Sequence, residues 1–84
     1  MPSIERILEQ MRRAPARVRF DDVAKVCAHH FGAPRTSGSS HRVYRTPWRG
    51  DPRVNIQRSK DGSAKPYQVK QVLWAIDRLA KEEP

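Results

Sequence analysis

The chain has 84 residues, with 17 lysines and arginines against 9 aspartates and glutamates, so its formal net charge is +8. This length predicts one small domain, spanning residues 1–84, with a single hydrophobic core. The charge predicts a polyanionic partner, most commonly nucleic acid. The absence of a long apolar run excludes a signal peptide or a membrane span, so we expect a cytoplasmic protein with no membrane partner.

A first helix is predicted over residues 3–14. Ser3 is suited to the N-cap position, and Pro15 ends the helix. Arg12 and Arg13 fall in its last turn, where cations are favoured by the helix dipole. Apolar side chains at helical spacing define its inner face, namely Ile4, Ile7, Leu8 and Met11.

A second helix is predicted from Phe20 to Gly32. Asp21 and Asp22 lie in its first turn, and Gly32 is expected just after its last turn. The single cysteine, Cys27, cannot form an internal disulfide and falls on the apolar stripe, so we expect a buried, unreactive thiol. The rest of this stripe is formed by Phe20, Val23, Ala24 and Phe31.

Three short strands are predicted after the second helix, because the apolar spacing there changes to two. Residues 35–37 are suited to an edge strand and residues 40–46 to a longer one. Residues 53–57 alternate polar and apolar, so Val54 and Ile56 are expected to face the core.

A last helix is predicted from Pro66 to about Lys81, after turns at Pro47–Pro52 and Asp61–Ser63. Trp74 lies beside its apolar stripe and is expected in the core or an interface. The element order is therefore α-α-β-β-β-α. It predicts the α+β class, with a small three-stranded antiparallel sheet covered by helices on one face. The residues expected on the buried side of the last helix are Val69, Val72, Leu73, Ile76, Leu79 and Ala80.

Cations are concentrated between residues 35 and 70, where nine lysines and arginines accompany two aspartates. A run of nearly one sign on a sheet repels itself, which favours an anionic partner over a merely solvated face. Lys65 begins the last helix, where it can anchor a phosphate or form a solvated cap. Trp48 can stack on an unpaired base, bind a protein partner or fold back onto the domain. The cations that we assign to RNA binding are Arg42, Arg45, Lys65 and Lys70.

A turn of small residues leads into a histidine, His41, on the second predicted strand. Histidine can take and give a proton near neutrality, so His41 is a candidate for acid–base catalysis on a phosphodiester. Gly38, Ser39 and Ser40 allow a phosphate to approach the backbone closely, and the two serine hydroxyls can donate hydrogen bonds to it. Arg42 and Arg45 can neutralise charge that builds up on phosphorus.

The alternative for His41 is a surface or half-buried strand residue with a satisfied hydrogen bond. Strand alternation puts His41 on the face of Val43 and Tyr44 on the opposite face. If Val43 belongs to the core, His41 lies at the rim of the covered face, beside a helix end. A rim position suits an active group better than an open sheet.

The sequence indicates neither a metal site nor a cofactor site. His29 and His30 are adjacent on the second helix, point in different directions and have no further ligand at i+3 or i+4. Asp21 and Asp22 are better explained as a helix start than as a Mg²⁺ site. Glycine-rich nucleotide cradles are missing from the sequence as well.

The chain resembles the HicA family of toxins from bacterial type II toxin–antitoxin systems over roughly residues 20 to 80. The family has a Gly-Ser-His-His-hydrophobic-aromatic string entering its second strand. Aligned on Tyr44, the active histidine of that string falls on His41. Ser39 stands where the glycine is usual, and Arg42 replaces the second histidine. The likeness is carried by the helix Phe20–Gly32, Ser39 to Tyr44, Arg53 to Ile56, Lys65 and the helix to Leu79.

The resemblance implies a double-stranded-RNA-binding-like fold for residues 20–82, with residues 3–14 as an amino-terminal extension. It implies a toxin that cleaves mRNA independently of the ribosome, with His41 as the catalytic residue, and that a HicB-type antitoxin neutralises. Operator DNA would be contacted only through the antitoxin complex. Two alternatives stay open: an RNA-binding module of the same fold without chemistry, and a half-inactive toxin that serves mainly in operator repression.

Overall fold

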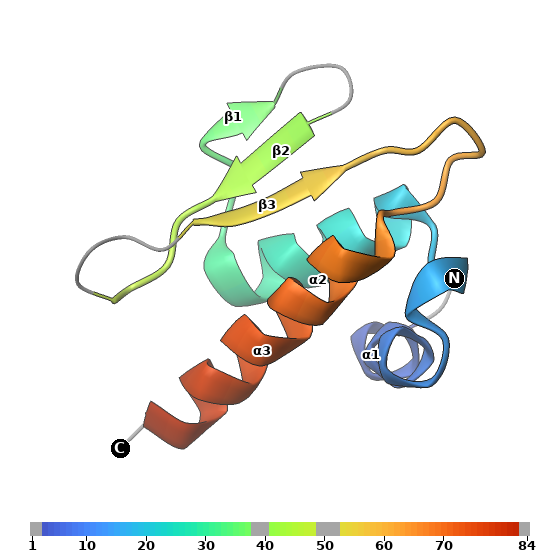
Figure 1. Ribbon diagram of the computed structural model, residues 1–84. Helices are drawn as coiled ribbons and strands as arrows, with labels where there is room; N and C mark the ends of the chain where they lie inside the picture. The colour runs from blue at the N-terminus through green and yellow to red at the C-terminus, as the bar shows by residue number, and fades with distance from the viewer. Residues whose placement is uncertain (1–2, 38–40, 49–52, 83–84) are drawn as a thin grey trace.

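The computed structural model describes residues 3–37, 41–48 and 53–82. It confirms the α+β class, with α-helices gathered on one face of an antiparallel sheet (Figure 1). A short 3₁₀-helix joins the first two α-helices, where the sequence indicated only a connector. In chain order the elements are α1 (Ile4–Arg13), η1 (Pro15–Arg17), α2 (Phe20–Phe31), β1 (Thr36–Ser37), β2 (His41–Tyr44), β3 (Val54–Gln57) and α3 (Pro66–Glu82).

The helix boundaries follow local signals. The Ser3 hydroxyl accepts a hydrogen bond from the Arg6 amide at 3.2 Å, which caps α1 as expected. Gly32 ends α2 with a φ of 86°, a left-handed conformation that glycine adopts without strain. The predicted N-cap of α1 and the predicted glycine at the end of α2 are both confirmed, and α3 begins at Pro66 as predicted.

β2 and β3 form the main antiparallel pair, and the two residues of β1 pair with the other edge of β2. Tyr44 lies opposite Val54, and Arg42 lies opposite Ile56. Val54 and Ile56 are buried, as predicted. Because cross-strand partners share a face, Arg42 and Tyr44 also lie on the face that the helices cover.

The expectation that Val43 could be a core residue is wrong. Val43 is only half-buried, whereas Tyr44 is fully buried. The Tyr44 hydroxyl lies 3.4 Å from the Ala24 carbonyl oxygen on α2, to which it donates. Alternation correctly places Val43 and Tyr44 on opposite faces of the strand. The larger side chain, that of Tyr44, is the one that fills the space under α2. His41 and Val43 therefore lie on the open face of the sheet.

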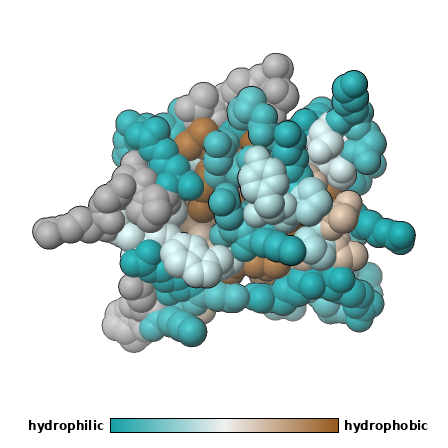
Figure 2. Space-filling model, in the orientation of Figure 1, coloured by the Kyte–Doolittle hydropathy of each residue, from teal (hydrophilic) through white to brown (hydrophobic). Residues whose placement is uncertain are grey.

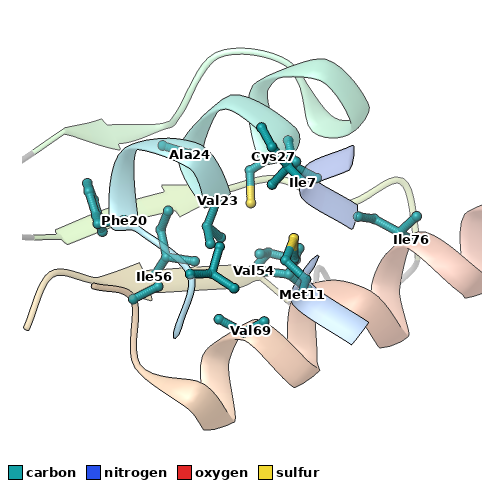
Figure 3. Packing of buried hydrophobic residues seen from close by; sticks show 14 of the residues in the cluster. Ile7, Met11, Phe20, Val23, Ala24, Cys27, Val54, Ile56, Val69 and Ile76 are labelled. Carbon is teal, nitrogen blue, oxygen red and sulfur yellow. The ribbon is translucent and has the colours of Figure 1, made fainter. Parts of the chain in front are cut away.

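The core lies between the sheet and the helices, and all three α-helices contribute to it (Figure 3). Ile7 and Met11 of α1 are fully buried, so the helix that the resemblance sets outside the family-like region packs into this core. Ala80 is exposed, contrary to the expectation for α3, and Trp74 is also exposed rather than in the core. Buried residues that periodicity missed are Val18, Val26, Ala64, Gln68 and Ala75.

The thiol of Cys27 is fully buried at the centre of this core, as predicted (Figure 3). Burial raises the pKa of Cys27 to about 12, because the thiolate would be desolvated. Since an ordinary cysteine has a pKa of about 8.5, we expect the native thiol to react at least about 10³-fold more slowly than the unfolded chain at pH 8. Reaction with a chromogenic disulfide, with and without urea, measures this ratio. A native rate close to the unfolded one would contradict it.

Candidate catalytic and nucleic-acid-binding site

His41 is the first residue of β2, and its side chain is exposed. Its cross-strand partner on β3 is Gln57, so both lie on the open face of the sheet. The prediction that His41 lies at the rim of the covered face is therefore wrong. His41 instead lies at the start of β2 on the open face of the sheet, where solvent and a ligand can both reach it.

Arg42 follows His41 directly but points to the opposite face. Its guanidinium carbon lies 5.3 Å from the centroid of the buried Phe20 ring, at the start of α2. Burial raises the pKa of the neighbouring Tyr44 phenol, and a hydrogen bond with Arg42 opposes part of that shift. Arg42 thus reaches a ligand only around the end of the strand, and not across the open face beside His41.

Arg58 also converges on Phe20, and the sequence did not single it out. Its guanidinium carbon lies 4.9 Å from the Phe20 ring centroid, and one of its nitrogens lies 3.0 Å from a carboxylate oxygen of Asp21. Two guanidinium groups therefore share one aromatic ring, an arrangement favoured by the quadrupole of the ring. Because residues 20, 42 and 58 are distant in sequence, no local pattern indicated this cluster.

The turn between β3 and α3 places Lys60 at the same end of the molecule. The Asp61 carboxylate accepts hydrogen bonds from the Ser63 amide at 3.0 Å and the Ser63 hydroxyl at 2.6 Å, and these bonds lower the pKa of Asp61. Gly62 has a φ of 87° and accepts a hydrogen bond from the Phe20 amide at 2.9 Å. The predicted turn is confirmed, and it is anchored to the start of α2.

A buried glutamine fixes the start of α3 beside β3. Gln68 is 3% exposed, and its side-chain oxygen accepts a hydrogen bond from the Gln57 amide at 2.7 Å. This bond satisfies a backbone donor on the edge strand β3, which explains a buried polar residue that the apolar pattern could not indicate. The same bond keeps the start of α3 beside the end of β3. The half-buried Lys65, which directly precedes α3, therefore lies at the end of the molecule where β2 begins with His41.

The start of β2, the end of β3 and the starts of α2 and α3 thus lie at one end of the molecule (Figure 1). Of the predicted RNA-binding residues, Arg42 and Lys65 belong to this end, and Lys70 is exposed about one turn along α3. Arg45 is exposed beyond the opposite end of β2, about 13 Å of strand from His41. Ser39 and Ser40 lie outside the described residues.

Trp48 folds back onto the domain, the third of the alternatives that its sequence context allowed. It is half-buried against the core, and its ring centroid lies 6.3 Å from that of Trp74. The guanidinium carbon of Arg78 lies 4.3 Å from the Trp48 ring centroid. Trp48 is therefore engaged within the domain on the α3 side.

The described residues contain no group of three or more histidine, cysteine, aspartate or glutamate side chains that could hold a metal ion. Nor is any of the described helices both long and apolar enough to cross a membrane. Comparison of the chain with protein-family models, curated proteins and solved structures gave no match. A functional proposal for this chain therefore rests on the geometry of the site and on the sequence resemblance.

Proposed function

We propose that this protein is a HicA-type toxin, an endoribonuclease that cleaves mRNA with His41 as its general base. The observation that supports the proposal is an exposed imidazole at the end of the molecule that also carries Arg42, Arg58, Lys60 and Lys65, of which Arg58 is paired with Asp21 (Figure 1). Such a surface attracts and positions RNA through its phosphates. The proposal includes a cytoplasmic location and a three-stranded, double-stranded-RNA-binding-like arrangement for residues 20–82, in the order α-α-β-β-β-α.

The chemistry requires a phosphate at the start of β2, since only there can it lie near both His41 and the cations around Phe20. His41 takes a proton from a ribose 2′-hydroxyl or from water, and the resulting oxygen nucleophile attacks phosphorus. The bond from phosphorus to the leaving ribose oxygen breaks, and that oxygen takes a proton from solvent. Arg42 and Lys65 neutralise the charge that develops on the phosphate oxygens. Arg45 contacts a different part of the RNA, because about 13 Å of strand separates it from His41. No metal ion is part of this step, because an imidazole can move the proton itself.

A basic nuclease also needs control, and a HicB-type antitoxin of complementary charge is the partner that we propose. It would cover His41 and the cations beside it. Operator DNA would be bound only by the resulting complex of toxin and antitoxin. If the toxin has little activity, its main role would be in that complex, as part of the repressor of the operator.

An RNA-binding module without chemistry is the second candidate, and one observation favours it. The residues of β2 and β3 that share the open face with His41 are Val43, Asn55 and Gln57, none of which titrates. A general acid for the leaving oxygen is therefore not supplied by these neighbours. RNA retention without cleavage, even with excess protein, would identify this module.

The proposal predicts that the purified full chain cleaves a labelled single-stranded mRNA fragment equally well with and without EDTA. If four cations contact phosphates, raising the salt concentration from 50 to 200 mM should weaken binding about 50-fold. Gel analysis of the RNA and fluorescence anisotropy measure the two effects. Cleavage that EDTA abolishes would contradict the proposed mechanism.

A further inference from the structure

The outer face of α3 carries aromatic side chains that the core does not use. Among the described residues, the large hydrophobic side chains left exposed are Tyr67, at 57%, and Trp74, at 59%. They are seven residues apart on one helix, so they lie on the same side, about 10 Å from each other along the axis. Figure 2, in the orientation of Figure 1, shows mostly hydrophilic residues in this view, with residues of intermediate hydropathy and some hydrophobic ones among them.

Cations alternate with these aromatic residues along α3. Lys70, Arg78 and Lys81 lie four or seven residues from Trp74, so they share its side of the helix. Asp77 is also nearby, but Arg12 holds its carboxylate at 2.6 Å and lowers its pKa through that hydrogen bond. The charge that this face offers to a ligand is therefore positive.

Trp74 stands between two hollows in the surface. One, of about 210 Å³, lies between β3 and α3 and is lined by Trp48, Arg53, Val54, Gln71 and Ala75 together with Trp74. The other, of about 170 Å³, is lined by Asp77, Arg78 and Lys81 together with Trp74. Trp48 meets the Trp74 ring edge to face, at an interplanar angle of 61°, and the Arg78 guanidinium carbon lies 5.6 Å from the Trp74 ring centroid. Both neighbours support the ring, which is still 59% exposed.

We propose that this outer face of α3 is a second RNA-binding surface, on which unpaired bases stack against Trp74 and Tyr67 while Lys70 and Lys81 contact phosphates. Arg78 packs on the rings of Trp48 and Trp74 and adds positive charge beside them. The inference rests on the proposed function, because it takes RNA as the ligand. The start of α3 lies beside the candidate site, because the Gln57 amide donates a hydrogen bond to Gln68 on α3 and Gln57 pairs with His41 across the sheet.

The interleaved charges favour RNA over a protein partner. The centre of a protein interface is depleted of lysine, whereas here Lys70 lies within one turn of both exposed aromatic residues, Tyr67 and Trp74. Aromatic platforms with cations along a track are typical of single-strand binding, because an unpaired base has a free face and a duplex does not offer one. The occupant should therefore be single-stranded.

The test uses the full chain and a short fluorescein-labelled 2′-O-methyl RNA, which has no 2′-hydroxyl nucleophile. Trp74→Ala should weaken its binding about 5- to 150-fold, the effect of losing one stacked base, while Trp74→Phe should retain most of the affinity. Arg6→Ala, an exposed cation on α1, is the control and should change affinity little. RNA should quench the tryptophan emission of the wild type more than that of Trp74→Phe.

Equal affinities of wild type and Trp74→Ala for the single-stranded RNA would overturn the inference. It would also be overturned if Trp74→Ala weakened binding of the same RNA in a duplex as much as binding of the single strand. Unchanged RNA binding with weakened antitoxin binding would identify a protein interface instead. In each case cleavage by the wild type would leave the proposed function standing. A wild-type chain that neither binds nor cleaves RNA would remove the proposed function itself. Because Trp74 is mostly exposed, circular dichroism should show an unchanged fold.

Discussion

Replacing His41 by alanine should slow RNA cleavage by about 10²- to 10⁴-fold, the contribution of a positioned general base. The affinity for RNA should change little, because phosphate contacts by the surrounding cations supply most of it. The fold should also persist, since the His41 side chain is exposed and lies on the open face of the sheet. Single-turnover cleavage of labelled mRNA, followed on gels, measures the rate.

The chain offers a matched control for this substitution. His29 is also an exposed histidine, but it lies in the last turn of α2, whereas the candidate site lies at the starts of α2 and β2. His29→Ala should therefore cleave at the wild-type rate. In cells, His41→Ala should abolish growth arrest and still bind the antitoxin, whereas His29→Ala should remain toxic. Wild-type cleavage by His41→Ala, or an equal loss in both variants, would contradict the role of His41.

The parts of the fold that the sequence predicted well are those with local causes. Ser3 caps α1 through its own hydroxyl, Gly32 ends α2 through its own φ angle, and Asp61 closes its turn through hydrogen bonds to Ser63. The buried positions of Val54 and Ile56 also follow from alternation within one strand. In each case the residues that decide the structure lie within a few positions of one another.

The sheet face of His41 could not be predicted in this way. Alternation is symmetrical, so it separates Val43 from Tyr44 but does not say which of them the helices cover. That choice depends on α2, where Ala24 leaves space and offers a carbonyl group to the Tyr44 hydroxyl. The information therefore lies about twenty residues away from the strand.

The candidate site shows the same limit. His41 could be chosen from its neighbours in sequence, but Arg58 joins the site only because it packs on Phe20 together with Arg42. Trp48 likewise turned inward because Trp74 and Arg78 on α3 form its surroundings. Contacts between distant segments set the charge and shape of the surface, and periodicity has no access to them.

Tyr44→Ala should be the most destabilising substitution in the sheet, because it empties the space that the fully buried ring fills against the helices. Removing a buried aromatic ring costs about 3–5 kcal/mol of unfolding free energy. A domain of this size has roughly 4–13 kcal/mol in total, so the variant should be partly or wholly unfolded at physiological temperature. Tyr44→Phe should lose less, about 1–2 kcal/mol, since it keeps the ring and removes only the hydroxyl, with its long hydrogen bond to Ala24 at 3.4 Å and its hydrogen bond with Arg42.

Val43→Ala is the matched control on the adjacent residue of the same strand. Its side chain is half-buried on the open face, so truncation should cost about 1 kcal/mol or less. Urea denaturation followed by circular dichroism gives the three free energies on one scale. A larger loss for Val43→Ala than for Tyr44→Ala would mean that the helices cover the other face of the sheet. His41 shares the face of Val43, so it would then lie under the helices, where RNA could not reach it.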